Sequence, residues 1–355
     1  MLTKRNKTKK IKIGKVEIGG GSPIAVQSMT KTLTSDIDAT VQQIAELEKA
    51  GCQIIRCAVP DRESALALKE IKRQIKLPLV ADIHFQSEFA VMAAESGVDK
   101  LRINPGNIGS LEKVKSVVDA AKKRGIPIRV GVNSGSLEKE ILKKHNGHVT
   151  AEGLAESALK NVRILEDLGF HDIVISLKAT SVPLTIRAYE IVSERSPYPL
   201  HVGITEAGIP KLGIVRSSVG IGAILAAGIG DTIRVSLTGD PVEEVRTGYE
   251  ILKSLELVEH GVTIISCPTC GRAGITVVKI AEEIERRTRQ IKQPLKIAIM
   301  GCEVNGPGEA ADADVGLAGG QGVGLIFREG KIVRKVPEAE MVEALLDEIE
   351  SMAIK

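Results

Sequence analysis

The chain has 355 residues, more than one compact domain usually holds, so we expect two domains. Hydrophobic residues make up 43% and aromatic residues only 2%, so Val, Ile, Leu and Ala must fill the core, as in parallel sheets. The scarcity of aromatic rings, the net charge of +3 and the lack of a long apolar run argue against nucleic acid and membrane as partners and predict a cytoplasmic protein. Near the N-terminus, the basic stretch TKRNKTKKIKIGK is interpreted as a solvated tail rather than a nucleic-acid arm.

Short runs rich in Val, Ile and Leu recur through the first 255 residues. There are eight of them, at residues 23–29, 53–59, 78–85, 100–106, 127–133, 172–179, 200–208 and 232–239. Helical patterns lie between them, and several end at a glycine typical of helix C-termini: Gly51, Gly97, Gly125, Gly169 and Gly228. The repeat predicts an α/β fold, a (β/α)₈ TIM barrel over residues 1–258. An open doubly wound sheet is the alternative, disfavoured by the count of eight and by the absence of a dinucleotide fingerprint.

The alternation of apolar runs and helical patterns changes after Leu255, and we place a short linker near residues 258–261. Two apolar runs then lead into cysteine-containing loops, an amphipathic helical pattern lies between them, and glycine-rich strands and a closing helix follow. Residues 259–355 are therefore predicted to form a smaller α+β domain.

Charged side chains interrupt the barrel strands, where a packed interior should be apolar. They are Arg56, Asp82, His84, Arg102, Arg129, Lys178, Glu206 and Arg234, accompanied by Asn104, Asn133, Ser176, Thr205 and Ser236. Several recur at spacing two, which puts both members of a pair on one face of a strand. Most lie in the second half of a run, and the C-terminal ends of barrel strands are where such enzymes build active sites.

The balance of these charges indicates an anion site. Five cations face two acids, Asp82 and Glu206, and although mutual salt bridges could account for any one residue, they leave a positive surplus. Arginine suits bidentate phosphate contact, and the chain has no P-loop, so a small metabolite with one or two phosphates fits best. The acids remain candidates for proton transfer or for orienting hydroxyls. His84 is an acid, a donor to the anion or a core histidine.

The five cysteines are too few for a disulfide framework, and three of them indicate a metal site. Cys267 and Cys270 form a CxxC, and Cys302 follows 32 residues later in a second loop. Structural zinc or a four-iron cluster needs a fourth ligand, for which His260, Glu303 and Glu309 are candidates. Cys52 and Cys57 lie in the second barrel repeat and are interpreted as core residues.

Four motifs, SCPTCGR, MGCEVNGPGEA, RVSLTGDP and KLRINPGNIG, resemble the bacterial 4-hydroxy-3-methylbut-2-en-1-yl diphosphate synthase family (IspG, also called GcpE). The resemblance covers essentially the whole chain, and the two cysteine motifs are highly specific. It implies the reductive ring opening and dehydration of 2-C-methyl-D-erythritol 2,4-cyclodiphosphate, in the non-mevalonate isoprenoid pathway. Electrons would come from flavodoxin or ferredoxin, and the small domain would resemble the cluster domain of sulfite and nitrite reductases.

The resemblance also implies roles for single residues. A [4Fe–4S] cluster would be held by Cys267, Cys270, Cys302 and Glu309. Asp82, Glu206, Glu309 and Asn305 would be catalytic. The substrate would be bound by Arg56, His84, Arg102, Asn104, Arg129, Asn133, Lys178, Arg234 and Ser236.

Two rival functions remain at this point: a non-redox iron–sulfur dehydratase, and a zinc-stabilised sensor of a phosphorylated metabolite. Chain direction adds a prediction about assembly. The last barrel helix, residues 241–255, delivers the chain to the end of the barrel opposite the active site. We therefore expect a homodimer in which the cluster domain of one subunit caps the barrel of the other.

Overall fold

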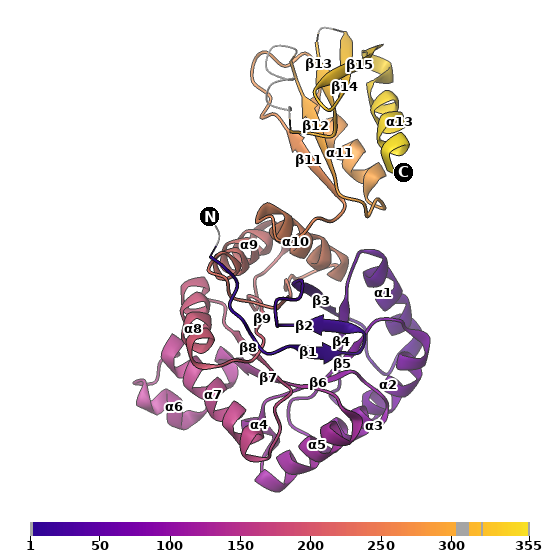
Figure 1. Cartoon of the computed structure of the whole chain (residues 1–355). Helices are drawn as coiled ribbons and strands as arrows, with labels where there is room; N and C mark the ends of the chain where they lie inside the picture. The colour runs from indigo at the N-terminus through magenta and orange to yellow at the C-terminus, as the bar shows by residue number, and fades with distance from the viewer. Residues whose placement is uncertain (1–2, 303–311, 321, 354–355) are drawn as a thin grey trace. The chain divides into compact units, whose positions relative to one another are not determined.

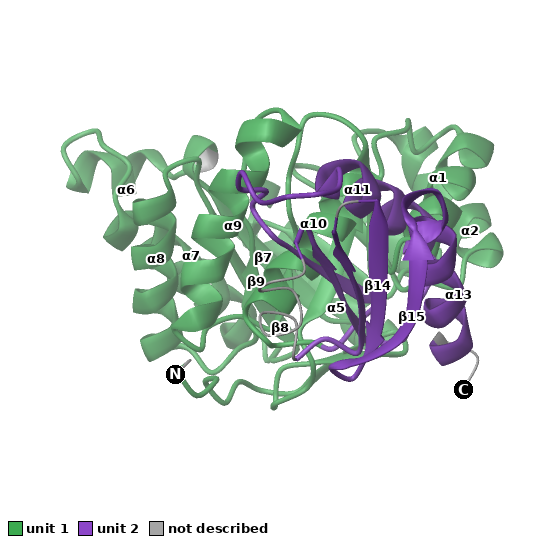
Figure 2. Cartoon of the chain, turned by 90° about the horizontal axis from the view of Figure 1, so that it is seen from above, with its two compact units in different colours: residues 1–258 green, residues 259–355 purple. Residues whose placement is uncertain are grey.

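The computed structural model describes residues 3–302, 312–320 and 322–353. The chain divides into two compact units, residues 1–258 and 259–355 (Figure 2). The division falls at the start of the predicted linker.

The first unit is a parallel barrel of eight strands, as predicted (Figure 1). The order around the sheet is β8-β7-β6-β5-β4-β3-β10-β9, and a parallel bridge between Ile175 and Leu200 joins the two ends of this order. The strands are β3 (Ala25–Met29), β4 (Ile54–Ala58), β5 (Leu79–Asp82), β6 (Lys100–Ile103), β7 (Ile128–Asn133), β8 (Ile173–Lys178), β9 (His201–Val202) and β10 (Thr232–Ile233).

Helices surround the barrel and carry the chain back between strands (Figure 1). They are α1 (Ile37–Lys49), α2 (Arg62–Gln74), α3 (Ser87–Glu95), α4 (Pro105–Ile108), α5 (Leu111–Arg124), α6 (Lys139–Lys144), α7 (Ala151–Asp167), α8 (Val182–Arg195), α9 (Pro210–Ala226) and α10 (Pro241–Ser254), with a 3₁₀ turn η1 (Ser134–Ser136). Side-chain caps begin several of them; Asp61, for example, accepts a 2.7 Å hydrogen bond from the Ser64 backbone N–H at the start of α2. The five predicted helix-end glycines all have positive φ, which confirms their role.

The basic N-terminal stretch is not a solvated tail, and that interpretation is wrong. The Arg5 guanidinium lies 3.0 Å from the Asp231 carboxylate, and Thr8 donates to the same carboxylate at 2.9 Å. The hairpin of β1 (Ile11–Ile13) and β2 (Val16–Ile18) then packs on residues from the first halves of the strands, Ala25, Ile54, Val80 and Val174. The stretch therefore closes the N-terminal end of the barrel with apolar side chains, which leaves the C-terminal end as the mouth.

In its described residues, the second unit is a five-stranded mixed sheet with two helices, matching the predicted α+β domain. Its strands are β11 (Val262–Ser266), β12 (Leu295–Met300), β13 (Val315–Gly319), β14 (Val323–Arg328) and β15 (Lys331–Pro337), and its helices are α11 (Val277–Thr288) and α13 (Met341–Ala353), with a 3₁₀ turn η2 (Glu338–Glu340). Ile284 of α11 and Leu345 of α13 share one buried cluster with Ile297 and Leu317 of the sheet. β11, β12 and β13 are parallel neighbours, so the cysteine loops after β11 and β12 leave the sheet at the same edge.

Over the described part of the chain, every helix is too short or too polar to cross a bilayer.

Candidate active site

Asp82 anchors one group of cations inside the barrel. Arg102 donates from Nη1 to Asp82 Oδ1 at 3.1 Å, and Arg56 Nε lies 3.8 Å from Asp82 Oδ2. His84 Nε2 lies 3.4 Å from the same carboxylate and 2.9 Å from Arg102 Nη1. Burial raises the pKa of Asp82, but Arg56, Arg102 and His84 together hold it well below its ordinary value. Asp82 is thus an ionised anchor that fixes the two arginines.

Two glycines, Gly131 on β7 and Gly203 directly after β9, make room for cations of the barrel. A Cβ at Gly131 would lie 2.4 Å from Arg102 Nε, and the Gly131 carbonyl accepts a 3.0 Å hydrogen bond from Arg102 Nη2. A Cβ at Gly203 would lie 3.2 Å from Lys178 Nζ and 2.5 Å from the Arg234 carbonyl oxygen. A side chain at either position would displace a cation of the site.

Glu244 anchors a second group, which the sequence reasoning missed. It lies on α10, is 1% exposed, and sits 3.5 Å from Arg234 Nη2 and 3.1 Å from Lys31 Nζ. It also accepts hydrogen bonds from the Leu237 backbone N–H at 3.0 Å and from Ser28 Oγ at 3.4 Å. The periodicity of α10 places Glu244 beside the buried positions Val245 and Gly248, and this was the only sequence signal for it.

Three buried cations have no carboxylate anchor. Lys100, Arg129 and Lys178 are 0%, 1% and 7% exposed, and within the described residues none of them forms an ion pair. Nε and Nη1 of Arg129 have no hydrogen-bond partner in the part of the chain that the structure describes. Burial, followed by repulsion from neighbouring arginines, lowers the pKa of all three well below their ordinary values. Removing such charges from water without a counter-ion is costly, so these side chains are poised for an anion.

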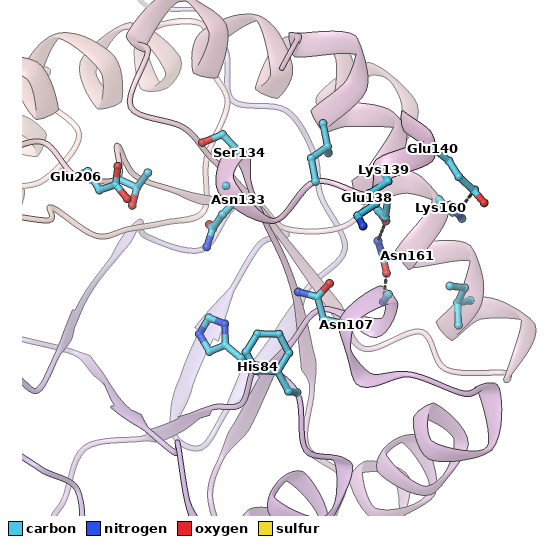
Figure 3. Close-up of a pocket in the computed structure, with 16 residues that line it drawn as sticks. His84, Asn107, Asn133, Ser134, Glu138, Lys139, Glu140, Lys160, Asn161 and Glu206 are labelled. Atoms are coloured by element: carbon cyan, nitrogen blue, oxygen red, sulfur yellow. Dashed lines mark hydrogen bonds and ion pairs between the residues drawn. The ribbon is translucent and has the colours of Figure 1, made fainter. Parts of the chain in front are cut away.

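Glu206 stands apart from the cations and lines a pocket at the mouth. The pocket has a volume of about 830 Å³, and His84, Asn133 and Thr205 line it with Glu206 (Figure 3). Thr180 Oγ1 donates to Glu206 Oε2 at 3.1 Å, and Glu206 has φ of +53°, a left-handed conformation that a side chain adopts only when its surroundings enforce it. The prediction that Asp82 and Glu206 face the five cations holds for Asp82 only: among the described residues, Glu244 pairs with Arg234, and no ion pair joins Glu206 to any of the five.

A hydrogen-bond network supports the outer side of the pocket (Figure 3). Asn161 donates to Glu138 Oε1 at 3.2 Å and accepts from the Gly106 backbone N–H at 2.7 Å, while Ser157 donates to Glu138 Oε2 at 2.6 Å. This network holds the loop after β6, which begins at Asn104. Asn104 is 2% exposed, and among the described residues neither its Oδ1 nor its Nδ2 has a hydrogen-bond partner. It is therefore available to a bound molecule.

The cysteines of the second unit follow adjacent parallel strands. Cys267 comes directly after β11, and its Sγ accepts a 3.2 Å hydrogen bond from the Gly301 backbone N–H on the neighbouring loop. Cys302 is partly buried and Cys270 exposed, and hydrogen bonding from Arg272 lowers the pKa of Cys270. Free thiols, one of them accepting a backbone N–H, suit a thiolate-bound metal or cluster.

Three residues predicted near the metal lie outside the described residues. They are the predicted fourth ligand Glu309, the alternative ligand Glu303 and the predicted catalytic residue Asn305. Among the described residues no three His, Cys, Asp or Glu side chains gather closely enough to hold a metal ion. Cys52 and Cys57 are buried barrel residues, as predicted, and burial raises their pKa to about 12 and about 11.

Comparison with known proteins decides the family. Residues 8–249 match the GcpE TIM-barrel domain and residues 263–351 match the GcpE protein C-terminal domain. The chain belongs to the GcpE family. Similar curated relatives are named 4-hydroxy-3-methylbut-2-en-1-yl diphosphate synthase (flavodoxin). One from Caldanaerobacter subterraneus is 60% identical over 99% of both chains, and one from Geobacillus thermodenitrificans is 59% identical over 98% of this chain and 93% of its own.

Solved structures add the fold of the barrel alone. A dihydropteroate synthase from Xanthomonas albilineans, with a TM-score of 0.51 and 12% identity, covers 70% of this chain. A type I 3-dehydroquinate dehydratase from Clostridium difficile, also with a TM-score of 0.51 and with 15% identity, covers the same share. At such identity only the barrel architecture of the GcpE chain is supported.

Some of the predicted barrel residues of this GcpE chain lie together as expected, and others do not. Arg56, Asp82, His84 and Arg102 form one contacting group. Arg234 belongs to the Glu244 group instead, and Ser236, half-buried, follows two residues later. Asn133 and Glu206 lie at the pocket. The salt-bridge alternative thus holds for Arg56, Arg102 and Arg234, and fails for Arg129 and Lys178.

Proposed function

We propose that this GcpE-family chain converts 2-C-methyl-D-erythritol 2,4-cyclodiphosphate to (E)-4-hydroxy-3-methylbut-2-en-1-yl diphosphate. The reaction consumes two electrons and two protons, breaks the ring C–O bond to phosphate, forms a C=C bond and releases one water. The activity is that named for the relatives at 60% and 59% identity. The observation that carries it in this structure is the group of buried cations without carboxylate anchors, which suits a diphosphate.

In this proposal the diphosphate binds over Arg129 and Lys178, which have no counter-ion of their own. Arg102 and Arg234, held by Asp82 and Glu244, flank it with donors of fixed direction. Such preorganised donors bind the charge that the diphosphate gains when the ring opens. Glu206 and His84 at the pocket hold or pass protons at the hydroxyl that leaves as water.

The second unit would hold the electron carrier. A [4Fe–4S] cluster on Cys267, Cys270, Cys302 and Glu309 would supply electrons to the bound substrate when loaded. Its donor would be flavodoxin, which the relatives' names mention, or a ferredoxin. The backbone N–H of Gly301 would stabilise the Cys267 thiolate.

Anaerobic purification tests this function. We expect a brown protein with about four iron and four sulfide per chain, and turnover of the cyclic diphosphate only when a one-electron reductant is present. A Glu309→Ala variant should fold and lose most of its activity. A colourless protein carrying zinc, or turnover without reductant, would contradict the proposal, and a near-normal spectrum and rate in Glu309→Ala would move the fourth ligand to His260 or Glu303.

We also propose that the active site is shared between two copies of the chain. Glu244, near the start of α10, contacts the site, whereas the Tyr249 hydroxyl donates at 2.8 Å to Gly51, which precedes β4. The helix thus runs away from the mouth, and its 14 residues span about 21 Å. The chain leaves the first unit at the end opposite the cations. The second unit of one copy would therefore cap the barrel of the other, with the linker near residues 258–261 as hinge.

A mixed dimer tests the shared site. One subunit carries Arg234→Ala and the other Cys270→Ala, so that each alone is inactive. If the site is shared, each heterodimer keeps one intact site and activity partly returns. No recovery in a verified heterodimer, or full activity in a monomer, would rule the sharing out.

A further inference from the structure

Lys100 occupies an unusual position for a lysine. It lies on β6 two residues before Arg102, so both side chains are on the same face of the strand. It is 0% exposed, and the polar contact found for its ammonium nitrogen is with Gln27 Oε1 of β3, at 3.4 Å. Within the described residues no carboxylate forms an ion pair with it.

The groups that face Lys100 are cations, or bases that could become cations. Arg129 of β7 and Arg56 of β4 repel its positive charge, and His201 of β9 lies close enough to be affected by it. Burial, then Arg129 and Arg56, lower the pKa of Lys100 well below its ordinary value. A buried ammonium without a counter-ion is costly, which favours the neutral amine when no anion is bound.

The polar atoms without partners in this region are mostly donors. They are Nε2 of Gln27, Nε and Nη1 of Arg129, and the ring Nε2 of His201, which donates or accepts. Side chains buried to 1% or less with free donors require an acceptor, and the described residues do not provide one. A diphosphate, which is rich in acceptor oxygens and carries negative charge, would meet that need.

We propose that Lys100 is a further member of the anion site and that it takes up a proton when the diphosphate binds. This inference rests on the proposed function, because it names a residue of the same site. The negative charge of the ligand offsets the repulsion from Arg129 and Arg56, which makes the ammonium form favourable in the complex. Lys100 would thus change its charge when the ligand binds, whereas the charges of Arg102 and Arg129 would stay the same.

The chemistry of the substrate allows the proton taken up by the protein to be measured. Each phosphorus of a cyclic diphosphate carries a single, strongly acidic hydroxyl, so the ligand does not titrate near neutral pH. Any proton taken up on binding therefore belongs to the protein. By linkage, affinity for the cyclic diphosphate should fall as pH rises between the pKa values of free and bound Lys100, by at most about tenfold per pH unit.

Calorimetry of the cluster-loaded, oxidised enzyme without reductant tests the proposal. The cyclic diphosphate is titrated in two buffers of different ionisation heat at mildly alkaline pH, so that binding occurs without turnover. We expect wild type to take up most of one proton. Lys100→Met should take up clearly less, bind about tenfold more weakly at the acid end of the pH range and show a flatter pH profile. Lys115→Met, exposed on α5, is the matched control and should behave like wild type.

Several outcomes separate the possibilities. Unchanged proton uptake in Lys100→Met would overturn the inference. Loss of uptake in His201→Gln, with uptake kept in Lys100→Met, would assign the proton to the imidazole instead. A second neutral variant, Lys100→Gln, replaces the methionine variant if that one does not fold, and carries the same expectation. Failure of wild type to bind the cyclic diphosphate would instead contradict the proposed function.

Discussion

The barrel holds buried positive charge in two different ways. Arg56, Arg102 and Arg234 are paired with the buried carboxylates of Asp82 and Glu244. Lys100, Arg129 and Lys178 have no such partner among the described residues. Both groups lie on neighbouring strands inside the same barrel. A difference in burial therefore does not explain why only one group is paired with carboxylates.

This difference shows how one site combines side chains of fixed direction with affinity for an anion. A paired arginine is fixed in direction, and its partner cancels part of its charge, so it adds stability and specificity more than attraction. An unpaired buried cation destabilises the empty protein, because it either keeps a charge without a counter-ion or, as a lysine, gives up its proton, and a bound anion makes the charged form favourable. We therefore expect substitutions in the paired group to affect folding first, and substitutions in the unpaired group to affect binding first.

Removing an anchor should have the largest effect. Glu244→Ala leaves Arg234 and Lys31 without their carboxylate and should lower the free energy of unfolding by about 3–5 kcal/mol. Glu243→Ala is the control, because the neighbouring Glu243 is about half exposed and pairs only at the surface with Arg246. Urea unfolding of both variants provides the measurement. Equal, small losses in the two would show that Glu244 is not an anchor.

Removing an unpaired cation should act on binding instead. Lys178→Met should weaken binding of the cyclic diphosphate roughly ten- to hundredfold, because one charge-assisted hydrogen bond of about 1.5–3 kcal/mol is lost. Its stability without ligand should stay the same or rise. The measurements are KM and thermal unfolding, with Lys69→Met on the exposed face of α2 as control. A less stable variant with unchanged KM would place Lys178 in the paired group.

Filling the space beside Gly203 should have an intermediate effect on stability and binding. Gly203→Ala puts a methyl group 2.5 Å from the Arg234 carbonyl oxygen and 3.2 Å from Lys178 Nζ, and should cost about 1–3 kcal/mol of stability. It should also weaken diphosphate binding, because Lys178 must move. Gly222→Ala on α9, where a Cβ meets nothing within 4 Å, should instead stabilise by up to about 1 kcal/mol. Similar changes in the two variants would contradict the close approach.

The pH dependence of stability should show the smallest effect. Lys100 and Lys178 have lowered pKa values in the fold, so the unfolded chain binds more protons than the folded one between those values and the ordinary lysine pKa. The free energy of unfolding of the anion-free protein should therefore rise with pH from neutral to mildly alkaline conditions. Urea unfolding at several pH values should show a shallower rise in Lys178→Met than in wild type. A slope equal in both proteins would mean that Lys178 is charged in the empty barrel.

Much of this protein follows from local sequence rules. The alternation of apolar runs and amphipathic helices predicts the barrel, because each repeat encodes its own strand and helix and five of them also encode a terminal glycine. Charges at spacing two inside strands place Arg102 and Lys178 at the mouth of a barrel, whatever the details of packing. The paired cysteine motifs identify the family without any geometry.

Tertiary structure alone decided which charges are paired. Glu244 lies 10 residues from Arg234 on a different kind of element, and Asp82 lies 20 residues from Arg102, so no local pattern links them. In the sequence Lys100 looks like one more strand residue; the structure shows that it is buried, contacts the neutral amide of Gln27, and forms no ion pair among the described residues. The N-terminal stretch reads as solvated because its charges outnumber its apolar residues, yet Ile11, Ile13 and Ile18 fill the end of the barrel. In each case the energy depends on neighbours brought together by the closed sheet, and the sequence does not contain those distances.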